Sequence, residues 1–286
     1  DDALEDIGDE TAAKTAERRK KNDHVVAHWR FQEGVSGDVA GTRARGFGAG
    51  GPASGGFSSE DLLSGRFARS FLAIIKDSSG NDRHGHAFGG PLYRTVQLEG
   101  SNLALVFDGH DDRVAIPDAP IFYLTKSLTL EAYIQVEKYP ETAANLSHIV
   151  FRGDSRAGFD PWFLAIMESG QLRFGVADAL NNGTVVVSPE PLPIGKLLHV
   201  AATLDDATGK QSVFINGKRV ATKKTKIRGF GALGGSAPGI GIGNRYLYSN
   251  QAFTGLIDEV RISATALSPS QLLPAPRSAE ATPRTD

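Results

Sequence analysis

The sequence contains no cysteine among its 286 residues. This absence excludes disulfide bridges, thiolate metal sites and a cysteine nucleophile. A cysteine-free chain of this length is more typical of an exported bacterial protein than of an animal extracellular protein, which usually carries disulfides. We therefore expect a secreted bacterial protein that works in an extracellular, periplasmic or cell-surface setting.

A large charge excess and a long apolar run are also missing. The formal net charge is −2 at pH 7, whereas a nucleic-acid surface is normally strongly basic, so we expect no nucleic-acid partner. No apolar run approaches the roughly 20 residues that span a bilayer, so we expect no membrane insertion. Residues 1–4 (DDAL) resemble no signal peptide and include no methionine. We therefore interpret the chain as a mature product or a segment cut from a larger polypeptide, without its export signal.

Three segments differ in composition from the rest. Residues 1–23 are first acidic and then basic, with almost no apolar face, which indicates a charged linker or a short helix, or alternatively a stalk next to a membrane. Residues 274–286 are rich in Pro, Ala, Ser and Thr and are expected to form a disordered tail. Residues 35–72 form a Gly-rich insertion. Loops of this length are usually functional or disordered, and the sequence leaves both open.

Between these segments the pattern is that of β-strands. Apolar and polar residues alternate strictly through 127–136, as they do in a strand with one buried face. Asn216 and Gly217 supply the positive φ angles of a type I′ turn and predict a hairpin between 211–215 and 218–222. Many short strands without amphipathic helices between them indicate an all-β sandwich or barrel. Further strands are expected at 24–31, 103–107, 113–116, 162–167, 171–177, 198–204 and 255–263, with one helical turn at 268–271.

Several segments, taken in order, resemble the LamG-like jelly-roll family, which is related to laminin G, pentraxin and concanavalin-like lectin folds. The resemblance implies one two-sheet antiparallel β-sandwich over 24–273. It also implies a binding module of a secreted or surface protein, which in this family often carries one calcium ion and in some members binds glycans. The segments are 26–34 (VAHWRFQEG), 76–81 (KDSSGN) with 84–85 (HG), 105–109 (LVFDG), 112–114 (DRV), 127–134 (SLTLEAYI), 198–203 (LHVAAT), 214–217 (FING), 255–262 (GLIDEVRI) and 266–269 (ALSP).

A structural Ca²⁺ site is the first candidate site. Calcium takes six to eight oxygen ligands, and Asp77 and Asn81 offer a carboxylate and an amide on a tight turn. Asp258 lies in the last strand, which in this fold pairs near the first strands, so we expect Asp77, Asn81 and Asp258 to share the ion, with Asp108 as a further member. The alternative is that Asp77 and Asn81 only cap a turn. His84 and His86 could form a zinc pair, but no third ligand is evident.

A ligand-binding loop is the second candidate. Residues 244–250 (NRYLYSN) combine two aromatic rings with amide and guanidinium groups. Sugar rings stack on aromatic side chains, while such polar groups bind hydroxyls. We therefore expect contacts from Asn244, Arg245, Tyr246 and Tyr248, with Trp162 as a weaker candidate. The alternative is an ordinary loop whose tyrosines pack against the protein.

Catalysis is not expected. A retaining glycosidase needs two carboxylates about 5–5.5 Å apart, but Glu131 and Glu137 lie about 20 Å apart along one strand face. We expect a non-catalytic module that binds a carbohydrate or surface polymer. The alternatives are a protein-contact or architectural domain of a larger cell-surface protein, and a glycoside hydrolase whose carboxylates come from different strands.

Overall fold

The computed structural model describes residues 24–40, 74–98, 101–142, 146–247 and 251–276. The expected charged segment 1–23 lies outside the described residues, as do residues 41–72 of the insertion and 277–286 of the tail. Within the described part of the chain, the one helical element is the 3-10 turn η1 (Pro120–Phe122), and no helix is long and apolar enough to cross a membrane.

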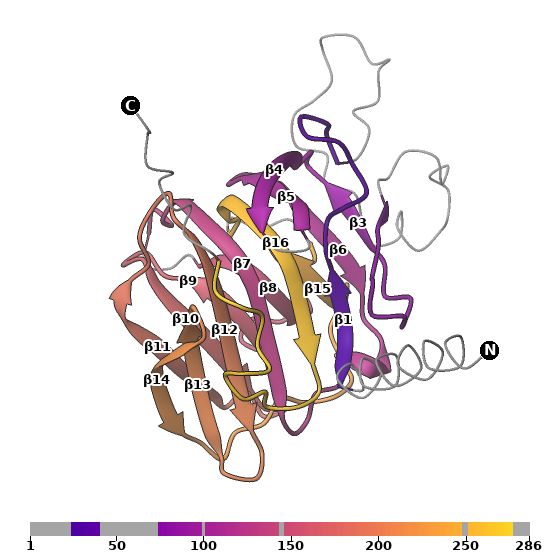
Figure 1. The fold of residues 1–286 in the computed structure, drawn as a ribbon. Coiled ribbons are helices and arrows are strands. Elements are labelled where there is room, and N and C mark those ends of the chain that lie inside the picture. Colours follow the sequence, from indigo (N-terminus) through magenta and orange to yellow (C-terminus); the bar gives the residue numbers. More distant parts are fainter. Residues whose placement is uncertain (1–23, 41–73, 99–100, 143–145, 248–250, 277–286) are drawn as a thin grey trace, which may run out of the picture.

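The described residues form two antiparallel sheets of eight strands each, stacked face to face as Figure 1 shows. The front sheet has the order β14-β13-β12-β7-β16-β5-β4, with β1 also paired with β16, and the back sheet has the order β11-β10-β9-β8-β15-β6-β3-β2. This confirms the predicted all-β, two-sheet antiparallel sandwich. The front strands are β1 (Val25–Trp29), β4 (Leu92–Leu98), β5 (Ser101–Asp108), β7 (Leu128–Lys138), β12 (Leu197–Asp205), β13 (Lys210–Ile215), β14 (Lys218–Lys224) and β16 (Thr254–Ser263). The back strands are β2 (Ile74–Ile75), β3 (Gly85–Phe88), β6 (Arg113–Pro117), β8 (Ser147–Gly153), β9 (Trp162–Ile166), β10 (Gln171–Ala177), β11 (Gly183–Pro191) and β15 (Gly239–Ile242).

The alternating pattern of β7 directs one row of side chains into the core between the sheets. Leu130 and Ile134 are fully buried there against residues of the back sheet such as Leu164 and Ile240. The predicted hairpin is also confirmed, because Asn216 and Gly217 have φ angles of 50° and 74° between β13 and β14. The helical turn expected at 268–271 is instead a single hydrogen-bonded turn, in which the Gln271 amide donates to the Ser268 carbonyl.

The outward face of β7 is not solvated as the alternation suggests. The chain after β16 runs back across the front sheet (Figure 1), and Leu272 packs on Ala201 of β12 and Phe214 of β13. Beneath this segment Glu131 accepts hydrogen bonds from His199 at 3.0 Å and from the Leu273 amide at 2.8 Å. His199 of β12 is therefore a buried cross-strand partner of Glu131.

Candidate functional site

Two glycines in β15 shape a pocket on the back sheet. In the sequence 239–242 (GIGI), Ile240 and Ile242 point into the core, so Gly239 and Gly241 face outward. A Cβ atom on Gly241 would lie 2.2 Å from the Asn244 carbonyl oxygen, and one on Gly239 would lie 2.2 Å from the Tyr246 ring. Because neither side chain is present, the loop that follows folds back onto its own strand.

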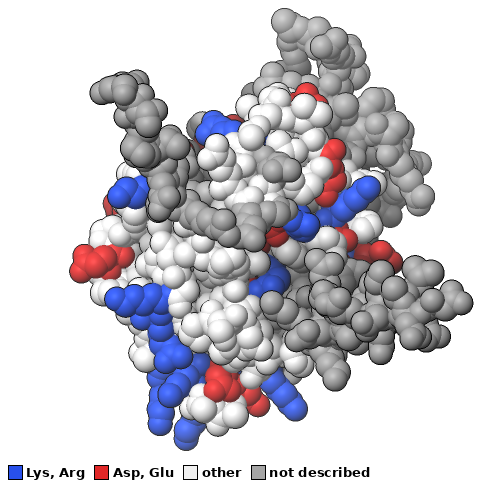
Figure 2. All heavy atoms as spheres, in the orientation of Figure 1, with Lys and Arg blue, Asp and Glu red and all other residues white. Residues whose placement is uncertain are grey.

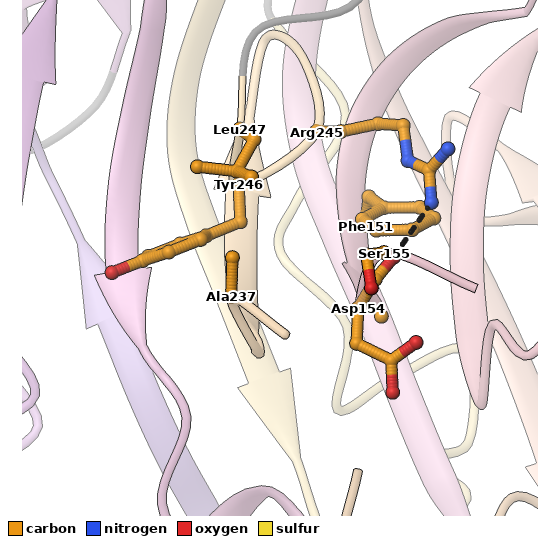
Figure 3. Close-up of a pocket in the computed structure, with 8 residues that line it drawn as sticks. Phe151, Asp154, Ser155, Ala237, Arg245, Tyr246 and Leu247 are labelled. Carbon is orange, nitrogen blue, oxygen red and sulfur yellow. Dashed lines mark hydrogen bonds between the residues drawn. The ribbon is translucent and has the colours of Figure 1, made fainter. Parts of the chain in front are cut away.

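This loop forms one wall of a pocket of about 180 Å³ on the outward face of the back sheet (Figure 3). Such a volume is below the roughly 300–1,000 Å³ of sites that enclose drug-sized ligands. The pocket therefore suits one residue or end group of a larger molecule. Its lining residues are Phe151, Gly153, Asp154, Ser155, Ala237, Arg245, Tyr246 and Leu247.

Arg245 is the cation of the pocket. Its guanidinium lies 4.6 Å from the centre of the Phe151 ring and donates a hydrogen bond of 3.1 Å to the Asp154 carbonyl oxygen. Its Nη2 is 3.6 Å from Asp160 Oδ1, which is too long for a hydrogen bond. Burial raises the pKa of Asp160 to about 6 although Arg245 opposes the shift. The guanidinium is thus held in place by an aromatic face, and among the described residues it donates one of its five N–H groups in a hydrogen bond.

Asp154 is the acidic residue among those that line the pocket, and its carboxylate already has several hydrogen-bond donors. It accepts hydrogen bonds from the Arg156 amide at 2.9 Å, from the Arg156 guanidinium and from the Gly235 amide at 2.8 Å. Burial alone would raise the pKa of Asp154, but these donors hold it below its ordinary value. Asp154 therefore fixes the neighbouring loops, and its side chain is fully buried by these contacts.

The structure places the predicted ligand residues unequally. Arg245 and Tyr246 line the pocket, as the ligand-loop hypothesis requires. Asn244 is fully buried, with its side-chain oxygen accepting the Arg245 amide, and so it supports the loop from beneath. Trp162 is a correction, because it is fully buried in the core and has no face for a ligand to stack on. Tyr248 lies outside the described residues.

The predicted calcium ligands do not converge. The Asp77 carboxylate accepts hydrogen bonds from the amides of His28, Ser79 and Arg83, which matches the alternative of a turn cap. The Asn81 amide donates to the carbonyls of residues 25 and 26 on β1. Asp258 is buried elsewhere, on the outward face of β16.

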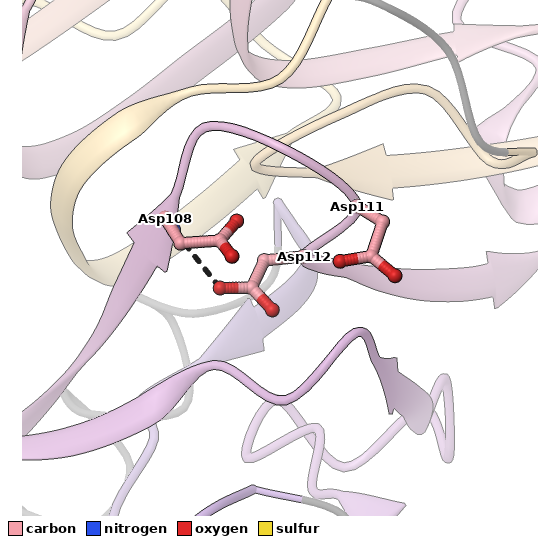
Figure 4. Close-up of side chains that lie close together, drawn as sticks. All are labelled: Asp108, Asp111 and Asp112. Atoms are coloured by element: carbon pink, nitrogen blue, oxygen red, sulfur yellow. Dashed lines mark hydrogen bonds between the residues drawn. The ribbon is translucent and has the colours of Figure 1, made fainter. Parts of the chain in front are cut away.

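Asp108 belongs to a different carboxylate group. Within the described residues, one group of three acidic side chains has oxygen atoms within 4.8 Å of one another (Figure 4). They are Asp108 at the end of β5 and Asp111 and Asp112 in the loop that leads to β6. Burial raises the pKa of Asp112 to about 7, and the charges of Asp108 and Asp111 add to the shift. Sequence reasoning missed Asp111 and Asp112, although the run 108–112 (DGHDD) carried the signal.

The structure places the two histidines at the start of β3. His84 Nδ1 accepts the Asp77 amide at 3.0 Å, and His86 lies on β3 with a pKa lowered by burial. Neither belongs to the one convergent acidic group of the described residues.

Comparison with known families identifies the class of protein. The model of the concanavalin A-like lectin/glucanases superfamily matches residues 108–273, more than half of the chain. The chain belongs to this superfamily, which confirms the predicted resemblance. No curated protein matches the sequence significantly.

Solved structures share the fold at low sequence identity. The binding domain of Paraclostridial Mosquitocidal Protein 1 aligns with a TM-score of 0.56 and 13% identity, covering 88% of this chain and 51% of that one. The binding domain of botulinum neurotoxin serotype G aligns with a TM-score of 0.55 and 10% identity, covering 86% of this chain and 49% of that one. The serotype D ligand-binding domain in complex with N-acetylneuraminic acid aligns with a TM-score of 0.53 and 13% identity, covering 87% of this chain and 50% of that one. The chain therefore spans about half the length of these structures.

Proposed function

We propose that this protein is a non-catalytic carbohydrate-binding module and that the pocket around Arg245 and Tyr246 holds the sugar. The observation that carries the proposal is the grouping of the Arg245 guanidinium, the Ser155 hydroxyl and the partly exposed Tyr246 side chain among the residues that line one small cavity. Phe151 is 2% exposed and its ring lies under the guanidinium, so it supports Arg245. Guanidinium and hydroxyl groups bind sugar hydroxyls or carboxylates, while ring surface accepts the C–H faces of the sugar. Such a module is expected to act in an extracellular, periplasmic or cell-surface setting, where glycan polymers are displayed.

The similarity to a neurotoxin domain solved with N-acetylneuraminic acid supports a glycan ligand. A protein-contact domain remains the competing proposal, since one fold hosts many functions. The two proposals differ in their ligand. The first requires a sugar small enough for the pocket, and the second requires a protein partner that binds without using the pocket.

The carboxylates near the pocket fit a binding role better than hydrolysis. Asp154 is occupied by the hydrogen bonds of Arg156 and Gly235, so it is poorly placed to act as a nucleophile. Glu131, one of the acids weighed for catalysis, is buried beneath the C-terminal segment. Release of reducing sugar from a bound glycan, abolished by Asp160→Asn, would replace the binding proposal with a hydrolase.

A glycan array tests the proposal, followed by titration of the best sugar. Arg245→Met keeps an unbranched apolar stem but removes the guanidinium donors, and we expect about tenfold to a hundredfold weaker binding from the loss of charged hydrogen bonds. Arg94→Met is the control, because Arg94 is an exposed arginine of β4 that does not line the pocket. An array without hits, or equal affinity in both variants, would contradict the proposal.

We also propose that the β5–β6 loop holds a calcium ion. The donor set fits, because three carboxylates converge and calcium prefers such hard oxygen ligands. A bound cation would relieve the repulsion that contributes to the raised pKa of Asp112. Asp108, Asp111 and Asp112 would hold it, and the ion would stabilise the connection between the two sheets.

Thermal unfolding with and without calcium tests this site. At 100 times the dissociation constant we expect calcium to raise the melting temperature by roughly 5 °C relative to EGTA. Asp111→Asn should abolish the shift, whereas Asp82→Asn, which removes an exposed carboxylate near Asp77, should keep it. This site would be ruled out if calcium left the melting temperature of the wild type unchanged, or if Asp111→Asn showed the same shift as the wild type.

A further inference from the structure

A second charged surface lies on the front sheet, away from the pocket. Residues 210–228 contain seven lysines and arginines and no acidic residue, in a chain whose net charge is −2. Six of them are exposed and form what we call the basic strip: Lys210, Lys218, Arg219, Lys223, Lys224 and Lys226. Figure 2 shows basic side chains gathered along the edge where β14 lies in Figure 1.

The basic strip is short of counter-charges. Within the described residues, Arg228 pairs with Asp206 at 2.6 Å, but no member of the strip forms an ion pair. Lys210 of β13 stands directly opposite Lys224 of β14 in the hairpin register. On its other side Lys210 faces Asp205 of β12, and its charge helps to lower the pKa of that carboxyl, whereas Lys224 lies on the edge strand. Like charges in this position destabilise a sheet. Lysines on an edge strand protect it from pairing with other chains, but that role does not require two of them to face each other.

The geometry of the strip favours an extended ligand. Arg219 and Lys224 lie on the outward face with Lys210, because they pair with Phe214 and Lys210 of β13. Lys218 and Lys223 point to the other face of the strand. The five steps from Arg219 to Lys224 along β14 span about 16 Å at roughly 3.3 Å per residue. The two-residue turn at Asn216 and Gly217 fixes the two strands relative to each other. A fixed row of cations of this length matches repeated charges along a linear polymer better than it matches one compact anion.

The side chains around the basic strip indicate which class of polymer it binds. None of the large exposed apolar side chains of the described residues lies on β13 or β14, so nothing there would insert into a membrane. Phe214 is 1% exposed and lies under Arg219, so it offers no ring on which single-stranded bases could stack. We propose that the basic strip binds a linear anionic polysaccharide, one that carries sulfate or carboxylate groups along its length.

Heparin is a suitable probe, with neutral dextran as the uncharged comparison. We expect the wild-type protein to bind heparin at 50 mM NaCl, with an affinity that falls as salt rises because binding releases counterions. The variant Lys223→Gln/Lys224→Gln should bind about tenfold more weakly and with a shallower salt dependence. The variant Lys76→Gln/Arg94→Gln removes the same charge from exposed positions outside the strip and should bind as the wild type does.

Lys224→Gln separates binding from a purely structural role. Removing one of the two facing lysines should raise the melting temperature slightly and weaken heparin binding at the same time. A rise in melting temperature with unchanged heparin affinity would overturn the proposal. So would equal losses in the strip variant and its control, or tighter binding to duplex DNA or anionic vesicles than to heparin. Arg245→Met, which tests the pocket, should leave heparin binding unchanged, so that the two proposals succeed or fail separately.

Discussion

Asp258 illustrates how burial changes the pKa of a single side chain. It is fully buried on the outward face of β16, where it accepts hydrogen bonds from the Ser101 hydroxyl at 2.6 Å and from the Glu259 amide at 2.8 Å. Burial raises the pKa of Asp258 to about 8, from 3.8 in an unfolded chain. The folded state therefore holds a proton that the unfolded state has lost between these two values. Stability from this group is present at low pH and is lost as the pH rises through about 8.

We expect Asp258→Asn to flatten this pH dependence, because the amide has the same shape and no charge to bury. The free energy of unfolding of the wild type should fall by on the order of 1–3 kcal/mol more than that of the variant between pH 6 and pH 9. Urea unfolding at both pH values measures the difference. Parallel losses in the two proteins would show that Asp258 does not titrate in this range.

At the scale of elements, β15 and its loop carry the proposed sugar site. Gly241→Ala would place a Cβ atom 2.2 Å from the Asn244 carbonyl oxygen. The backbone would have to move, which we expect to cost about 1–3 kcal/mol and to weaken glycan binding. Gly183→Ala in β11 is the matched control, since the nearest atom to its new Cβ is 3.9 Å away. Chemical denaturation compares the two, and equal stability would contradict the close approach of loop and strand.

Elements with a clear pattern could be predicted from the sequence, and others could not. β7 and the β13–β14 hairpin follow from strict alternation and from Asn216–Gly217. β15 was missed because glycine has low β-propensity, and its role depends on a loop that packs on it. β2 and β3 are too short to show a period.

The candidate site was predictable only in part, for a related reason. The loop at Arg245 and Tyr246 was marked by its composition, but composition could not show that Trp162 points into the core. Nor could it show that the C-terminal segment covers Glu131. Burial of these side chains depends on contacts between residues far apart in the sequence, such as the hydrogen bond from Leu273 to Glu131.

At the scale of the whole molecule, the sandwich separates the two proposed binding surfaces. The pocket lies on the outward face of the back sheet at β8 and β15, and the basic strip lies on the edge strand of the front sheet. Both sheets share one hydrophobic core, so each surface stands on a rigid base. A module of this kind could hold a sugar end group and an anionic chain independently.

Amide chemical-shift mapping tests the central claim most directly. On titration with the sugar selected by the array, we expect shifts concentrated at Ser155, Gly235, Ala237 and Gly239 around the pocket, with the amides of Asn216 and Gly217 unchanged. Shifts that gather on the β13–β14 hairpin instead, or no shifts at millimolar sugar, would contradict the account.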